Sequence, residues 1–154
     1  MPNLNWNNLT PLQVGRYAEY YAKMEFASYG FEIYTSEVDD HGVDFVIKKG
    51  SGCFYEVQVK SIRESNNGNY VFMKKTKFDI HNKRLLLCFI SFCIGQMPSV
   101  YIIHGAAWQI PNAVFVSRDY EGKKSSPEWG VNYSKIHRDS MAVYLIDNYS
   151  IQLS

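Results

Sequence analysis

A row of alternating polar side chains in the segment 56–60 is the first sign of chemistry in this chain. Residues two apart along a strand point to the same side, so Glu56, Gln58 and Lys60 share one face and two valines share the other. Water would explain this polar row on an edge strand. Apolar flanks favour a central strand, where a carboxylate, an amide and an amine must enter a cleft or find partners.

Asp44 is a second candidate, because it stands between the apolar residues Val43 and Phe45. Capping a turn is the ordinary role of such a carboxylate. The preceding turn, however, already has carboxylates of its own in Asp39 and Asp40. We therefore expect Asp44 to face the same cleft as the row at 56–60.

Glu19 is a third candidate, on a helix that the sequence predicts near the N-terminus. It lies one turn after Gly15, on the stripe of Ala22 and Phe26 that we expect to face a sheet. A glycine inside a helix costs about 1 kcal/mol relative to alanine, and close approach to another surface is one reason to tolerate it. A glutamate on this stripe needs a cation or a hydrogen-bond donor.

The helix that carries Glu19 has clear boundaries. Thr10 can cap it, Pro11 suits its first position, Gln13 completes a capping box, and Gly30 marks its end. Apolar residues recur at steps of three and four between these points. The stripe consists of Val14, Ala18, Tyr21, Ala22 and Phe26.

Three consecutive strands are predicted after the helix, in the ranges 31–35, 43–47 and 53–62. The turn 49–52 contains two glycines, which accept positive φ, so the second and third strands should form an antiparallel hairpin. The three strands then make a meander. This hairpin places Asp44 beside the polar row at 56–60.

The rest of the chain completes the sheet. The run 85–94 is apolar at nearly every position, which is typical of a strand covered on both faces, and a strand at 100–103 follows it. We expect an exposed loop at 63–69, a short strand at 114–117 and a helical segment near 139–149.

Composition is that of a single folded domain. The chain has 154 residues, of which 46% are hydrophobic and 20% charged, so residues 1–154 are expected to form one α/β (α+β) domain rather than a disordered tail. Sixteen Lys and Arg against fifteen Asp and Glu give a net charge of +1. Nucleic-acid binding would therefore need a local positive patch.

The segment 74–84 supplies such a patch, although runs of charge are often only solvated faces. Its basic residues are Lys74, Lys75, Lys77, Lys83 and Arg84. A weaker patch consists of Arg118, Lys123 and Lys124. We expect the first patch to contact a DNA backbone.

Several other classes of site lack support. The cysteines at 53, 88 and 93 are odd in number, form no CxxC pair and lie in apolar runs, so core packing is expected rather than disulfides or zinc. The four histidines lack zinc spacing, and there is no G-x-S-x-G, P-loop or G-x-G-x-x-G motif. No apolar run suits a signal peptide or a bilayer span, so a cytoplasmic setting is expected.

Three ordered motifs together resemble a known family: Gly15-x-x-Ala18-Glu19, the segment 42–47 around Asp44, and Gln58-x-Lys60. This combination is similar to the PD-(D/E)XK nuclease superfamily, and most similar to its Holliday-junction-resolvase and Mrr-like restriction branch. The resemblance covers about the first third of the chain. It implies a restriction-endonuclease-like fold, a mixed β-sheet flanked by helices.

The resemblance also implies an activity: a metal-dependent DNA endonuclease acting in restriction, repair or mobile-element processing, with a homodimer as one assembly. Asp44, Gln58 and Glu19 would hold Mg²⁺ or Mn²⁺, with Glu56 as an accessory. Lys60 would orient or deprotonate the attacking water, or stabilise the developing charge. Gln58 departs from the family, which usually has Glu or Asp there, so a metal should be held more weakly.

Two alternatives stay open at this stage. A catalytically weakened nuclease fold could bind nucleic acid or a protein without cleavage, as the neutral Gln58 and the small net charge suggest. An unrelated α+β structural domain would follow if Glu19 and Lys60 lay far apart.

Overall fold

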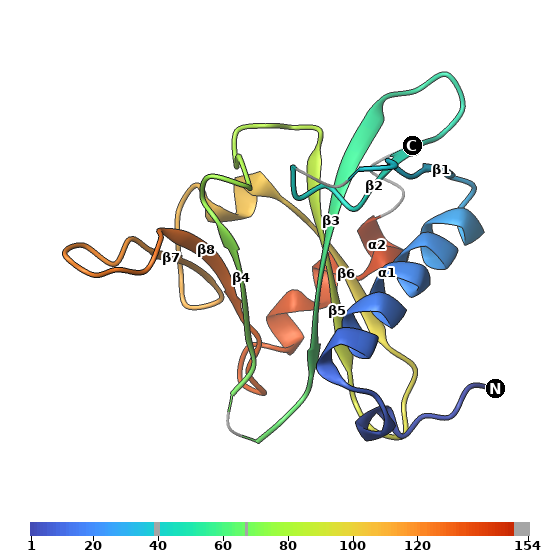
Figure 1. The fold of residues 1–154 in the computed structure, drawn as a ribbon, viewed down its shortest axis with the longest axis horizontal. Coiled ribbons are helices and arrows are strands. Elements are labelled where there is room, and N and C mark those ends of the chain that lie inside the picture. Colours follow the sequence, from blue (N-terminus) through green and yellow to red (C-terminus); the bar gives the residue numbers. More distant parts are fainter. Residues whose placement is uncertain (39–40, 67, 150–154) are drawn as a thin grey trace.

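The computed structural model describes residues 1–38, 41–66 and 68–149, and all structural statements concern these residues. Its main sheet has five strands in the order β1-β2-β3-β5-β6 (Figure 1). Only β3 and β5 are parallel, so the sheet is mixed, as expected. The strands are β1 (Glu32–Tyr34), β2 (Phe45–Lys48), β3 (Phe54–Arg63), β5 (Leu85–Phe92) and β6 (Ser99–His104).

The helix α1 (Pro11–Ser28) has the predicted boundaries. Thr10 and Gln13 form a reciprocal capping box, which satisfies backbone donors at the helix start. The chain turns beyond the helix at Gly30, whose φ of 89° suits a residue without Cβ. Four residues of the predicted stripe are buried: Val14, Ala18, Ala22 and Phe26.

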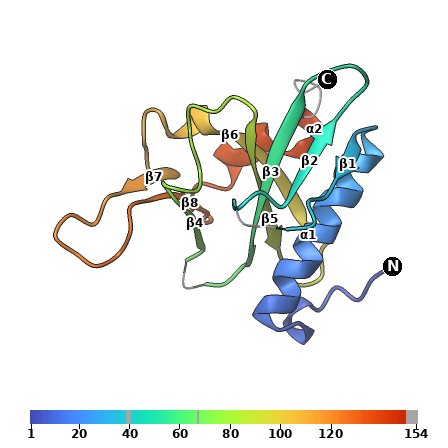
Figure 2. The ribbon, with the colours of Figure 1, turned by 45° about the horizontal axis from the view of Figure 1, so that its top comes forward.

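A second sheet, which the sequence did not predict, covers the other face of β3 and β5. It has three antiparallel strands in the order β4-β8-β7. Only β7 had been expected, as the strand at 114–117. Figure 2 shows this sheet and α1 on opposite sides of the main sheet. The strands are β4 (Tyr70–Lys74), β8 (Glu128–Asn132) and β7 (Phe115–Arg118). In β4 the outward residues Tyr70 and Phe72 are aromatic, so the strand lacks the polar alternation that marks a half-buried strand.

Short helices complete the described chain. Three are 3-10 helices, at Trp6–Asn8, Gly105–Trp108 and Asp139–Tyr144, and α2 is Ile146–Tyr149. The last two replace the single helical segment expected near 139–149. The roles proposed for Asp39 and Asp40, and position 67 of the expected loop, lie outside the described residues.

Two apolar cores share β5, all eight residues of which are buried. One lies between α1 and the main sheet and includes Phe45, Val57 and Cys88. The other lies under the second sheet and includes Leu87 and Phe89. Val57 belongs to the first core while its neighbour Gln58 faces the second, so the polar row of β3 points away from α1.

The cysteines divide between core and surface. Cys88 is buried, as predicted, and burial raises the pKa of its thiol. Cys53 is exposed, so the expectation that it packs in the core is wrong. It lies between the glycine-containing hairpin turn and the first residue of β3, just before the chain re-enters the sheet. No helix in the described part of the chain is long and apolar enough to cross a membrane.

Candidate active site

The ladder between β2 and β3 stops where Phe45 faces Val57. β3 continues beyond that point, paired only with β5, as far as Arg63. Asp44 lies at this opening. Its backbone N–H donates to the carbonyl of Val57 at 2.9 Å, and its Oδ2 accepts a hydrogen bond from the backbone N–H of Val59 at 2.6 Å. The carboxylate of Asp44 thus accepts, at the exposed edge of β3, a hydrogen bond that a partner strand would otherwise accept.

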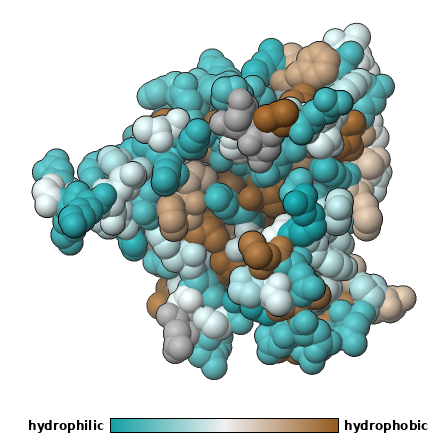
Figure 3. All heavy atoms as spheres, in the orientation of Figure 1, coloured by the Kyte–Doolittle hydropathy of each residue, from teal (hydrophilic) through white to brown (hydrophobic). Residues whose placement is uncertain are grey.

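A cavity of about 340 Å³ lies between this opening and β4. Asp44, Gln58 and Lys60 all line it, as the predicted hairpin register requires. The second sheet contributes the remaining wall. Within the described ranges the lining is Gly42, Asp44, Gln58, Val59, Lys60, Phe72, Met73, Lys74 and Lys77. In the space-filling view this face of the molecule is hollowed near its centre, with hydrophobic atoms at the base of the hollow (Figure 3).

Gln58 is held in one orientation. It is only 4% exposed, and its Nε2 donates to the carbonyl oxygen of Lys77 at 2.6 Å. Because a carbonyl only accepts hydrogen bonds, the amide nitrogen must point toward Lys77. The Oε1 atom therefore points the other way, and no residue in the described ranges donates a hydrogen bond to it. An oriented oxygen that lines a cavity and has no donor among the described residues suits a cation or a water.

Glu19 is not among the residues that line this cavity. It lies on α1, which covers the opposite face of the sheet, and its side chain is 21% exposed. Its carboxylate lies 3.5 Å from a guanidinium nitrogen of Arg16 and 3.7 Å from Nζ of Lys23. Lys23 in turn lies 5.8 Å from the ring centre of Phe45, next to Asp44 in sequence. The ammonium group of Lys23 therefore lies between the Glu19 carboxylate and Phe45, the first residue of β2.

The reason proposed for Gly15 is wrong. A Cβ at this position would meet nothing within 4 Å, and the residue is exposed. No close approach of the helix to another surface therefore requires a glycine here. The helix stripe that packs on the sheet passes through Val14 and Ala18, one position before Gly15 and Glu19.

Glu56 lies on the polar face of β3, as predicted, but in a neighbouring cavity of about 420 Å³. Its Oε2 accepts a hydrogen bond from Nδ2 of Asn82 at 3.3 Å. The two cavities share Gln58 and Lys77. Glu56 and Asp44 therefore line adjacent cavities, and Gln58 lies between them because it lines both.

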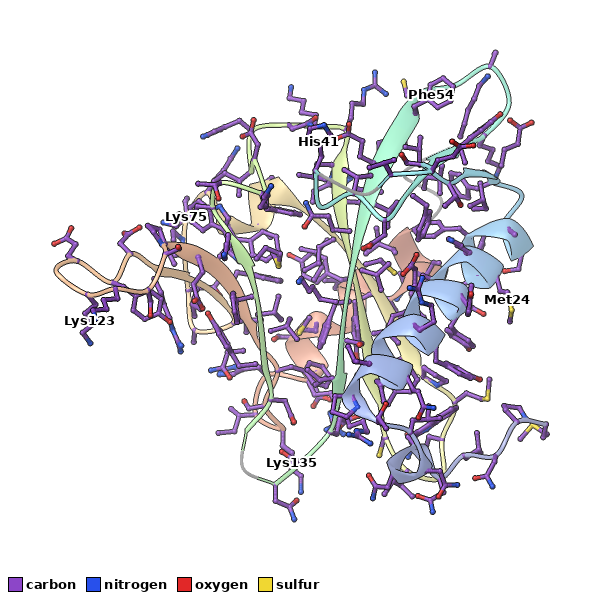
Figure 4. The ribbon with its side chains drawn as sticks, in the orientation of Figure 1. Met24, His41, Phe54, Lys75, Lys123 and Lys135 are labelled. Carbon is purple, nitrogen blue, oxygen red and sulfur yellow. The ribbon has the colours of Figure 1, made fainter. Side chains whose placement is uncertain are left out.

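The basic segment divides among several places. Lys74 and Lys77 line the cavity of Asp44. Lys75 instead binds the second sheet, with Nζ 2.7 Å from both Ser117 Oγ and Asp119 Oδ1 (Figure 4). The other two lie elsewhere. Lys83 borders another cavity, and the guanidinium of Arg84 lies 5.7 Å from the ring centre of Tyr55.

The charge around the cavity is therefore positive. Among the described residues that line it are three lysines, at 60, 74 and 77, and one carboxylate, that of Asp44. Across the described ranges, no three His, Cys, Asp or Glu side chains gather as a metal-binding group. Such a cavity attracts a phosphate before it attracts a free metal ion. The sequence did not predict Phe72 and Met73 as site residues, because they reach the cavity only through β4, a strand that was not expected.

Comparisons with known proteins support the fold. No protein-family model matches the sequence, and no curated protein matches it. Among solved structures, the bacterial homing endonuclease I-Ssp6803I matches with a TM-score of 0.50, over 90% of each chain at 13% identity. At that identity the likeness shows the fold alone. The expected nuclease-like α/β fold is confirmed.

Proposed function

We propose that residues 1–154 act as one domain, a metal-dependent DNA endonuclease of the PD-(D/E)XK superfamily, in its Holliday-junction-resolvase and Mrr-like branch. One observation carries this proposal. Asp44, at the point where β2 and β3 separate, lines a single cavity with Gln58 and Lys60. Restriction, repair or mobile-element processing would be its setting.

The side chains present fit Mg²⁺ or Mn²⁺ bound together with substrate. Mg²⁺ prefers oxygen donors, keeps several waters and is commonly held by one or two carboxylates plus phosphates. Asp44 offers a carboxylate, and Gln58 offers its oriented amide oxygen. We assign Glu19 an outer role, because Lys23 and Arg16 already neutralise its carboxylate. Glu56 serves as an accessory carboxylate in the neighbouring cavity.

The chain divides the work of phosphodiester hydrolysis among few groups. A bound divalent cation would polarise the phosphate and lower the pKa of a coordinated water. Lys60 lies on the same strand face as Gln58, where its ammonium group orients the attacking water or stabilises the developing negative charge. Lys74 and Lys77 bind phosphate oxygens and position the DNA backbone. Asp44 holds its place through the Val59 hydrogen bond.

The decisive experiment incubates the protein with branched, single-stranded and duplex DNA in Mn²⁺ or Mg²⁺. Cleavage by the wild type should require the metal and fall at least about 100-fold in Lys60→Ala, the order expected for loss of one charge-stabilising group. Lys135→Ala is the matched control, because this exposed lysine does not line the cavity and lies near the bottom of the molecule in Figure 4. Equal cleavage by Lys60→Ala would reject the assignment. The same samples, sedimented with and without DNA, test the homodimer that the resemblance implies.

A second function is favoured by a specific observation: the described residues that line the cavity include three lysines and one carboxylate. A module with this charge could bind nucleic acid without cutting it. Calorimetry with Mg²⁺ or Mn²⁺ in the presence of a short DNA separates the two functions. Metal binding that Asp44→Ala removes supports the enzyme, whereas DNA binding without any metal uptake supports the module.

A further inference from the structure

We propose that the cavity takes an unpaired nucleotide, with its base stacked on Phe72 and its phosphates held by the flanking lysines. This inference rests on the proposed function and names the substrate class: single-stranded DNA, or DNA unpaired at the site of cleavage. The carrying observation is an exposed aromatic ring on the rim of a lysine-lined cavity.

Phe72 lies at the centre of β4, on the side of the second sheet that faces away from its core. Its neighbours Val71 and Met73 are buried in that core, whereas Phe72 is 47% exposed. It lines the cavity together with Lys60 and Lys74. A large apolar ring that stays about half exposed beside lysines points to a ligand.

The ring of Phe72 belongs to a supported row. It lies 6.4 Å from the ring of Tyr70, centre to centre, at an interplanar angle of 21°. The guanidinium carbon of Arg118 lies 4.2 Å from the centre of the Tyr70 ring, and Tyr70 donates a hydrogen bond to the buried Glu128. Tyr70 is thus fixed on both sides, and it supports a flat surface that ends with Phe72 at the cavity.

Gly130 shows how closely this row is fitted to β8. A Cβ at Gly130 would lie 2.1 Å from Oη and 2.4 Å from Cζ of Tyr70, so only glycine lets the tyrosine ring lie flat on the sheet. The pairing register places Phe72 directly opposite Gly130. The chain therefore accommodates the two aromatic side chains on its outer face.

The chemistry favours an unpaired base over a paired one. In a duplex both faces of each base are covered by its neighbours, so an aromatic side chain gains contact only by forcing two bases apart. In a single strand the faces are open, and stacking on an aromatic ring contributes about 1–3 kcal/mol per base. The lysines at 60, 74 and 77 supply the accompanying phosphate contacts.

The test measures DNA affinity by fluorescence anisotropy in EDTA, where no cleavage occurs, with a single strand and a duplex of the same sequence. We expect Phe72→Leu to weaken single-strand binding about tenfold and duplex binding less than about twofold, since leucine keeps the apolar volume but cannot stack. Phe72→Tyr should retain single-strand affinity. Phe54→Leu is the matched control, because Phe54 is 51% exposed and lies at the far end of β3 (Figure 4).

Several outcomes would overturn the inference. Unchanged single-strand affinity in Phe72→Leu would remove the stacking site. An equal loss on both DNAs would indicate insertion into a duplex, and a loss in Phe54→Leu of the same size would indicate a general surface effect. If the wild type cleaves DNA through Lys60 while Phe72→Leu binds normally, only this inference fails. If the wild type neither binds nor cleaves any DNA, the proposed function fails with it.

Discussion

Asp44 satisfies the backbone N–H of Val59 with its own carboxylate, at 2.6 Å from Oδ2 to N. In a continued sheet a partner strand would supply this acceptor. The acid therefore replaces a strand at the point where β2 ends, and it keeps an opening beside Gln58 and Lys60. Asp44 thus has a structural role, its hydrogen bond to Val59, and a proposed chemical role in binding the metal. Different substitutions of Asp44 can separate these two roles.

Asp44→Asn should abolish cleavage with little loss of stability. The amide oxygen of asparagine still accepts the hydrogen bond of Val59, but the negative charge proposed to hold the metal is gone. We expect cleavage to fall at least about 100-fold and the free energy of unfolding to change by less than about 1 kcal/mol. Asp44→Ala should lose both, at a cost of about 1–3 kcal/mol. A fully active Asp44→Asn would remove this residue from the site; nuclease assays and urea unfolding measure the two effects.

Gln58→Glu should strengthen metal binding and weaken the fold. Glutamate adds a negative charge next to Asp44, which should lower the Kd for Mn²⁺ by about tenfold in calorimetry. It also removes the donor to the carbonyl of Lys77 and places two acceptors together in a buried position, which should cost about 1–3 kcal/mol. An unchanged Kd would show that the Gln58 side chain does not reach the metal.

The lysines of the cavity should set the salt dependence of DNA binding. Each phosphate contact adds about 0.7–0.9 to the slope of log affinity against log salt concentration. We expect Lys74→Ala and Lys77→Ala each to reduce this slope by about that amount. Lys75→Ala should leave it nearly unchanged, because Ser117 and Asp119 already hold the Lys75 ammonium. Titrations at several salt concentrations decide this, and an equal effect of all three substitutions would contradict it.

Two glycine substitutions should act in opposite directions. Gly15→Ala adds a methyl group in open space on a helix, so it should stabilise the protein by about 0.5–1 kcal/mol. Gly105→Ala would place a Cβ 2.5 Å from both Cα and the carbonyl oxygen of Ile80, backbone atoms that cannot rotate away, and should destabilise by about 1–3 kcal/mol. Thermal unfolding of the pair measures both signs. A loss of stability in Gly15→Ala would show that α1 does need its glycine.

His104 should make the fold sensitive to acid. Partial burial lowers the pKa of its imidazole from 6.5, so below that value the unfolded chain binds a proton more readily than the folded chain. The contribution of the neutral His104 to the stability of the fold is complete above pH 6.5. It is lost as the pH falls through the lower pKa of His104 in the folded state. His104→Gln cannot titrate, so its Tm should fall less than that of the wild type between about pH 7 and pH 5. Parallel Tm profiles for the two proteins would rule out this role.

Local patterns predicted several parts of the structure because their causes are local. The capping box of Thr10 and Gln13 needs only neighbours in sequence, and the glycine turn after Lys48 fixes the hairpin of β2 and β3. The two-residue period of a strand then places Gln58 and Lys60 on one face. The hairpin register places Asp44 beside them. The proximity of three of the four proposed catalytic residues could therefore be predicted without knowing the second sheet.

Packing between distant segments decided the rest. The sequence by itself determined the hairpin of β2 and β3, the helix before it and the polar face of β3, since each depends on periodicity and turns. Only the tertiary structure showed that Glu19 pairs with Lys23 outside the cavity, and that β4 brings Phe72 and Lys74 to the opening. Which face a helix covers and which strand closes a cavity depend on how whole layers pack, and a pattern within one segment does not contain that information.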